Sequence, residues 1–191
     1  MTATGAVAAQ WGWFEMQFVG YIRILSRPPH LAELVSKIPG SFDAKAKLLR
    51  KVARLTFARC PSLADKICDF STRANQTCKK RNAIIHGFWW DQSHFQPGKG
   101  VILMTEADGT GDFYSVALEQ IEALAMKIAD LSTEGAYLTW DPGMHSKWLT
   151  PDERSALQDY HKSFPAPQPE APILLDPNRK GSPTQPKPFQ A

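Results

Sequence analysis

The run Arg81-Asn82-Ala83-Ile84-Ile85-His86 holds the residue types best suited to chemistry in this 191-residue chain. A histidine can take or give a proton, and a guanidinium can grip a phosphate and offset its growing charge. These groups suit RNA cleavage by the RNA's own 2′-hydroxyl, a reaction that needs no metal. We predict Arg81 and His86 as catalytic residues and Asn82 as the residue that orients the imidazole.

The elements around this run place it at the end of a helix. Asn82 and His86 are four residues apart and therefore share one helical face. Arg81 and His86 are about 140° apart around the helix, but the length of arginine lets the two heads converge near the helix end. Gly87 follows directly, where a C-terminal cap is expected.

The stretch from Cys78 to Gly87 resembles the signature helix of HEPN domains, in which an arginine, often followed by a polar residue, precedes a histidine. The resemblance covers residues 6–133. It implies an up-and-down helical bundle and a homodimer in which two copies of the motif face each other. It also implies endoribonuclease activity in toxin–antitoxin, phage-defence or RNA-processing settings, where a cognate protein partner is common.

A non-catalytic role is the alternative. A single histidine at a helix end is commonly a structural cap, and polar clusters mark functional sites only statistically. Many HEPN proteins bind a nucleotide or mediate assembly without cleaving RNA. Arg23 and His30, or Arg154 and His161, show that similar spacings occur elsewhere in the chain. Exposure distinguishes the two readings, since a catalytic pair should open into a basic cleft.

Basic residues are concentrated in the first half of the chain. Residues 1–90 contain 14 Lys and Arg against 5 Asp and Glu, whereas residues 91–164 contain 5 against 12. A basic half is compatible with a polyanion such as RNA, with self-association of unlike faces, or with an ordinary solvated helix surface. The predicted RNA-binding residues are Lys45, Arg50, Lys51, Arg54, Lys79 and Lys80.

No metal or cofactor is implied by the sequence. Cys60, Cys68 and Cys78 are odd in number and form no CxxC pair, which argues against a disulfide framework and a standard zinc site. The apolar N-terminus is interrupted by polar residues such as Glu15 and Arg23, so we interpret it as an amphipathic core helix rather than a signal or membrane segment. We therefore expect a cytoplasmic protein.

Apolar periodicity predicts a mainly α protein with a small β-hairpin, at about residues 88–105, before the last main helix. A third short strand is expected at Phe113-Tyr114, and Ser115 is the expected cap of the helix that follows. The buried stripe of the second helix is predicted to be Leu48, Val52 and Leu55. The first helix is predicted to bury six residues, namely Trp11, Phe14, Phe18, Tyr21, Ile22 and Leu25, and the helix over 116–131 is predicted to bury Leu118, Ile121, Leu124, Ala125, Ile128 and Leu131. Helices are expected over residues 6–26, 31–38 (a short piece), 62–86, 116–131 and 151–161, and one starts near Ser41 or Asp43.

Three regions are expected along the chain. Residues 6–133 form the HEPN-like helical domain, and residues 134–162 form a C-terminal extension with a short helix capped by Thr150 and Glu153. Residues 163–191 are rich in proline, with eight of the fifteen prolines in the chain, and are predicted to be disordered.

Overall fold

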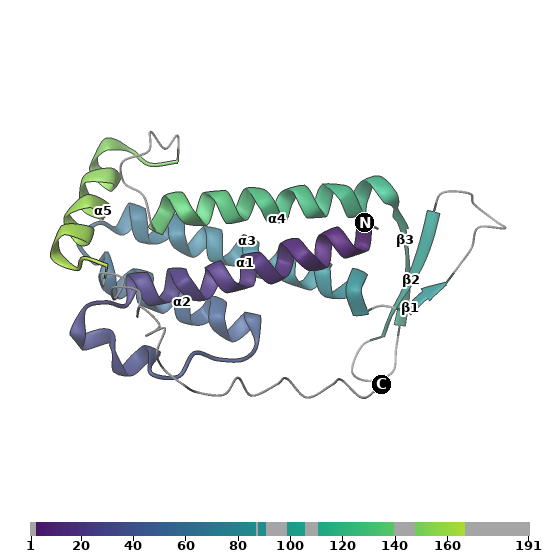
Figure 1. The fold of residues 1–191 in the computed structure, drawn as a ribbon, viewed down its shortest axis with the longest axis horizontal. Coiled ribbons are helices and arrows are strands. Elements are labelled where there is room, and N and C mark those ends of the chain that lie inside the picture. Colours follow the sequence, from purple (N-terminus) through teal and green to yellow (C-terminus); the bar gives the residue numbers. More distant parts are fainter. Residues whose placement is uncertain (1–2, 87, 91–98, 106–110, 140–147, 167–191) are drawn as a thin grey trace, which may run out of the picture.

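The computed structural model describes residues 3–86, 88–90, 99–105, 111–139 and 148–166. Within these ranges the protein is mainly helical, as predicted (Figure 1). Two 3₁₀ turns, Pro29–Leu31 and Glu33–Val35, stand where a short helical piece was expected. The α-helices are α1 (Ala3–Leu25), α2 (Phe42–Thr56), α3 (Pro61–His86), α4 (Leu118–Thr139) and α5 (Pro151–Ser163).

Between α3 and α4 the chain forms three strands, β1 (Phe88–Trp90), β2 (Lys99–Thr105) and β3 (Gly111–Ala117). They pair antiparallel in the order β1-β2-β3, with Trp89 opposite Ile102 and Ile102 opposite Tyr114. The sequence predicted a hairpin and a third short strand in this segment. Figure 1 shows the strands at one end of the bundle and α5 at the other.

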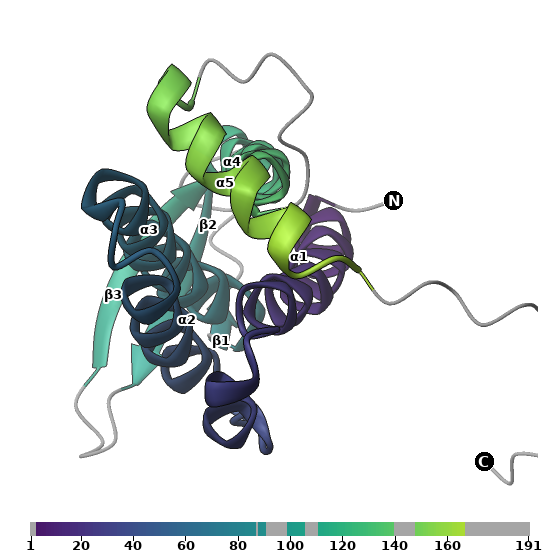
Figure 2. The same cartoon turned by 90° about the vertical axis from the view of Figure 1, so that its left-hand side faces the viewer.

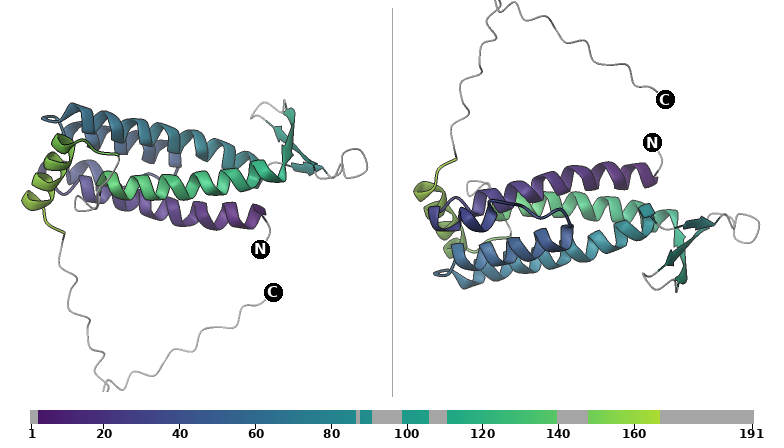
Figure 3. Two further views of the ribbon diagram at one scale, coloured as in Figure 1. Left: turned by 90° about the horizontal axis from the view of Figure 1, so that it is seen from above. Right: turned by 90° about the horizontal axis from the view of Figure 1, so that it is seen from below.

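The helix directions depart from the simple up-and-down order that was predicted. Lys45 near the start of α2 pairs with Glu15, whereas Thr56 at its end donates to the backbone oxygen of Leu25. The two helices α1 and α2 therefore run the same way, because the 3₁₀ turns return the chain along the bundle. The third helix, α3, runs against both, and its end reaches the strands (Figure 3).

Local sequence explains where several helices begin. The Ser41 hydroxyl accepts a hydrogen bond from the Ala44 backbone N–H and caps α2, as expected. Thr150 and Glu153 form the predicted reciprocal capping box of α5. Pro61 is the first residue of α3, where a helix has no use for the missing N–H.

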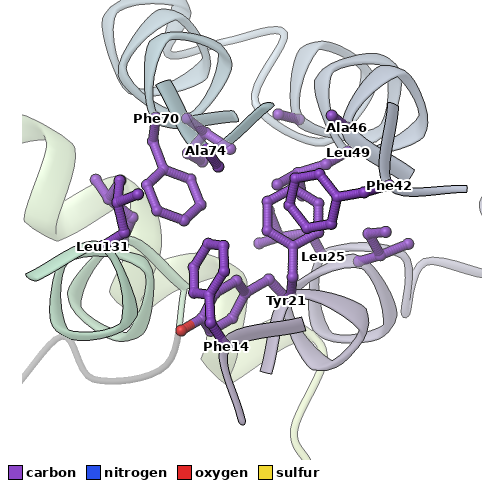
Figure 4. Packing of buried hydrophobic residues seen from close by; sticks show 14 of the residues in the cluster. Phe14, Tyr21, Leu25, Phe42, Ala46, Leu49, Phe70, Ala74 and Leu131 are labelled. Atoms are coloured by element: carbon purple, nitrogen blue, oxygen red, sulfur yellow. The ribbon is translucent and has the colours of Figure 1, made fainter. Parts of the chain in front are cut away.

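Aromatic side chains fill the centre of the bundle (Figure 4). The six predicted core positions of α1 are all buried. Phe42 of α2 and Phe70 of α3 both lie against Phe18, with ring centroids 4.7 and 6.0 Å away. Such offset and tilted ring pairs add to the free energy gained by removing apolar surface from water.

Two predicted stripes need correction. In α2, Leu55 is 48% exposed and Leu48 is only half-buried, while Leu49 is fully buried. Apolar residues at both 48 and 49 suit two faces, and the packing of α2 on α1 and α3 selects the face that carries Leu49. In α4, Leu118 is 50% exposed, whereas the rest of the predicted stripe is buried or half-buried.

The start of α4 also differs from the prediction. Ser115 and Val116 belong to β3, where they pair with Val101 and Gly100 of β2, so the helix does not begin at Val116 and Ser115 does not cap it. The helix begins at Leu118, directly after the last paired residue, and Gln120 accepts a hydrogen bond from the Ala117 backbone N–H.

The last helix packs on the rest of the bundle. Leu157 and Tyr160 belong to the main core, and Arg27 donates to the backbone oxygen of Phe164. Figure 2 shows α5 lying across the ends of α1 and α4. The expected boundary between residues 133 and 134 falls inside α4, so the predicted extension shares a helix and a core with the predicted domain. The proline-rich stretch 167–191 lies outside the described residues.

In the described part of the chain, no helix combines the length and the hydrophobicity needed to span a membrane.

Gly135 tests how tightly α1 and α4 are packed. A methyl group at this position would collide with the Tyr21 ring and come within 2.8 Å of Phe70 Cζ. We expect Gly135→Ala to lower the free energy of unfolding by about 1 to 3 kcal/mol.

Gly12→Ala in α1 is the matched control, because nothing lies within 4 Å of its methyl position. It should stabilise the protein by about 0.5 to 1 kcal/mol in urea denaturation, and an equal loss in both variants would contradict this account.

The buried Glu153 carboxylate makes stability depend on pH. Burial alone would raise its pKa, but hydrogen bonds from Lys66, the Thr150 backbone and Ser62 outweigh this effect and lower it. The ionised carboxylate therefore stabilises the fold above the ordinary glutamate pKa. This stabilisation is lost as the pH falls below that value and through the lowered pKa of the folded state. Glu153→Gln should lower the free energy of unfolding by about 1 to 3 kcal/mol at about pH 7 and by less at about pH 4. The partial exposure of Lys66 keeps this loss below that expected for a fully buried ion pair.

Urea denaturation at both pH values measures this difference. The exposed neighbour Asp152 provides the control variant Asp152→Asn, which should shift stability by a few tenths of a kcal/mol at most. A loss for Glu153→Gln that is the same at both pH values would show that the charge of Glu153 is not what stabilises the fold.

Candidate functional site

The predicted catalytic run lies in the last two turns of α3, at the end of the bundle that carries the strands (Figures 1 and 3). No proline or glycine interrupts α3 after Pro61, and Ile84 anchors its last turn in the core. Because Ile84 holds the last turn in place, the side chains of Arg81 and His86 can contact each other at the helix end. Gly87, the expected cap, lies outside the described residues.

One nitrogen of Arg81 joins the three predicted residues. Arg81 Nη1 donates to Asn82 Oδ1 at 2.9 Å and lies 3.3 Å from His86 Nε2. Nη1 carries two hydrogens, enough for both contacts. Nη2 makes no hydrogen bond with the described residues. The structure thus brings Arg81, Asn82 and His86 together.

The contact with Arg81 involves Nε2 of the His86 ring. Arginine has no acceptor atom, so Nε2 acts as the acceptor when this contact is a hydrogen bond. The residue is exposed, whereas Arg81 is half-buried. An exposed imidazole with an unprotonated nitrogen is suited to accept a proton from a bound hydroxyl.

The contacts of Asn82 differ from the one that was predicted. Its side chain was predicted to orient His86, but Oδ1 accepts from Arg81 and Nδ2 faces Cys78 Sγ at 3.8 Å. Asn82 therefore orients the guanidinium rather than the imidazole. Burial raises the pKa of the Cys78 thiol, and the nearby Arg81 offsets only part of that effect. Cys78 is accordingly a neutral packing residue and not a nucleophile.

Two residues of α1 complete the surroundings of Arg81. The guanidinium carbon lies over the Trp11 ring, 5.9 Å from its centroid, and the Trp11 indole N–H donates to Glu15 Oε2 at 3.2 Å. From the sequence, Trp11 was assigned to the core, and Glu15 was named only as a polar interruption of the same helix. A carboxylate four residues after a tryptophan on the same helical face was the available signal.

The predicted RNA-binding residues do not form one surface. Lys45 pairs with Glu15 at 2.6 Å, and only 12% of its side chain is exposed. The Lys45 ammonium is therefore largely buried in an ion pair with Glu15. Lys79 and Lys80 are exposed on α3, close in sequence to Arg81.

Arg50, Lys51 and Arg54 lie elsewhere, along α2. With Lys47 and Leu55 they line a shallow surface hollow of about 400 Å³. The Arg50 backbone oxygen accepts from Cys68 Sγ, so this hollow lies about 20 Å along the axis of α3 from Arg81. In the described ranges none of these three residues forms an ion pair. The hollow is thus a basic surface separate from the run Arg81–His86.

Comparison with protein-family models, curated proteins and solved structures returned no match. Functional assignment therefore depends on the geometry at the end of α3. Among the described residues, no group of three or more His, Cys, Asp or Glu side chains is arranged to hold a metal ion.

Proposed function

We propose that this protein is a HEPN-like, metal-independent endoribonuclease whose site is the Arg81-Asn82-His86 cluster. The observation that supports this most is the position of Arg81 Nη1, 2.9 Å from Asn82 Oδ1 and 3.3 Å from an exposed His86 Nε2. This arrangement joins a proton acceptor to a phosphate-binding cation. The resemblance of residues 78–87 to the HEPN signature points to the same chemistry.

In the proposed reaction, the 2′-hydroxyl of RNA replaces Arg81 as the partner of His86 Nε2. Nε2 takes the hydroxyl proton as the 2′-oxygen bonds to phosphorus, and the bond from phosphorus to the 5′-oxygen breaks. Arg81 Nη2 donates to a phosphate oxygen and stabilises the charge that develops there. The products are a 2′,3′-cyclic phosphate end and a 5′-hydroxyl end.

The departing 5′-oxygen needs a proton from a second group. Arg81 and Asn82 cannot give one up readily, so the donor is water or an imidazolium. A homodimer, as the family resemblance implies, would bring a second His86 to the site in the protonated form. Toxin–antitoxin or phage-defence roles, with a cognate protein partner, belong to the same proposal.

The test of this proposal compares wild type with His86→Ala and Arg81→Ala on a mixed single-stranded RNA in EDTA. Loss of the proton acceptor or of the cation should each lower the cleavage rate by about 100-fold or more. Wild-type products should carry cyclic-phosphate ends. The exposed His30 provides the matched control, and His30→Ala should cleave like wild type.

Circular dichroism and light scattering establish that all variants share one fold and one oligomeric state. If wild type and His86→Ala cleave equally, or if neither cleaves, the nuclease proposal fails. The protein would then be assigned the alternative role, in which the cluster binds a nucleotide or a protein partner without catalysis.

A second prediction concerns the basic hollow on α2. In the His86→Ala background, the further pair Arg50→Glu and Arg54→Glu should weaken binding of long single-stranded RNA about tenfold or more. It should also reduce the slope of log affinity against log salt by about 1 to 2, because fewer phosphates are neutralised. Fluorescence anisotropy at several salt concentrations measures both quantities.

The control pair for this experiment is Lys37→Glu and Lys127→Glu, two exposed lysines outside the hollow. It changes the net charge by the same amount. Equal weakening by both pairs would mean that RNA responds only to overall charge, and the hollow would then have no specific role.

A further inference from the structure

We propose that Trp11, Glu15 and Lys45 form a positioning network that holds the Arg81 guanidinium against His86. The network draws on three helices: Trp11 and Glu15 lie on α1, Lys45 on α2 and Arg81 on α3. Its effect on cleavage rests on the proposed function. Its effect on the placement of Arg81 does not, and the two can be measured separately.

Trp11 provides a fixed surface for Arg81. The residue is only 2% exposed, and its ring packs on Phe14 and Phe42 with centroid distances of 5.3 and 4.8 Å. A buried ring packed against two other core rings cannot change rotamer without disturbing the core. The cation over its face therefore keeps a defined position, 5.9 Å from the centroid.

Glu15 fixes the orientation of that ring and strengthens its attraction for the cation. Its Oε2 accepts from the Trp11 indole N–H at 3.2 Å, and its Oε1 accepts from Lys45 Nζ at 2.6 Å. Both carboxylate oxygens thus have a charge-assisted or polar partner. A carboxylate bound to the indole N–H polarises the ring toward greater electron density, which favours a cation over its face.

Lys45 keeps Glu15 from pairing with Arg81 directly. The Glu15 carboxylate and the Arg81 guanidinium both lie near enough to Cys78 to influence the pKa of its thiol. With Lys45 removed, Glu15 would be left with a half-buried, unpaired negative charge, and Arg81 lies over the same Trp11 ring that Glu15 binds. A direct ion pair would draw the guanidinium away from His86. Lys45 is therefore a positioning residue rather than an RNA contact.

The first experiment follows the Arg81 side chain by NMR. Arg81 Nε is buried and makes no hydrogen bond with the described residues, so its N–H signal should be protected from exchange and shifted by the indole ring current. Arg81→Lys assigns the signal by its loss. Trp11→Leu, Glu15→Gln and Lys45→Met should each move it. The matched control Trp13→Leu removes an exposed tryptophan of the same helix and should leave it in place.

The second experiment measures cleavage of RNA by the same variants. Glu15→Gln and Lys45→Met should lower kcat about 10- to 100-fold with little change in KM, because they misplace a catalytic group. Lys45→Arg, which keeps the charge, should recover most of the wild-type rate and signal position.

The two readouts separate failure of the network from failure of the nuclease proposal. If the Arg81 signal stays in place in Glu15→Gln and Lys45→Met, or moves equally in Trp13→Leu, the positioning network is overturned. If the signal moves as expected but wild type does not cleave RNA, the network stands and the proposed function is rejected.

Discussion

The contact between Tyr21 and Gly135 sets how closely α1 approaches α4, and the position of the candidate site follows from it. The Tyr21 ring occupies the space that a side chain at 135 would fill, and its hydroxyl donates to the buried backbone oxygen of Ser132 at 2.9 Å. Burial raises the pKa of this phenol, so it stays a neutral hydrogen-bond donor. A large aromatic residue against a glycine allows only one depth of packing.

From that contact, α1 extends toward the strands and carries Trp11 and Glu15 to the end of α3. The buried rings of Phe14 and Phe18 form a continuous series of ring contacts from Trp11 to Tyr21, so the helix is held by the core along this whole length. The surface of Trp11 and Glu15 that faces Arg81 is therefore positioned by core contacts two to three helical turns away. Groups of a binding or catalytic site are most accurately placed on such rigid elements.

The two ends of α3 use charge differently. Toward α5, Arg73 pairs with the buried Glu134 and Lys66 pairs with the buried Glu153, so these cations hold the bundle together. Toward the strands, Arg81 faces an indole, an amide and an imidazole, and none of these carries a full negative charge in the observed contacts. Among the described residues, no carboxylate pairs with Arg81, in contrast to Lys66 and Arg73.

Sequence alone determined the elements and the location of the cluster, because both follow from local rules. Helical spacing put Trp11 and Phe14 in the core, Ser41 and Thr150 marked helix starts, and the run from Arg81 to His86 fell in one helical end. Only the tertiary structure decided which groups oppose each other. It paired Lys45 with Glu15, some thirty residues apart, and placed Arg54 far from Arg81. Periodicity gives the face of each helix, whereas direction and depth of packing between helices select the partners.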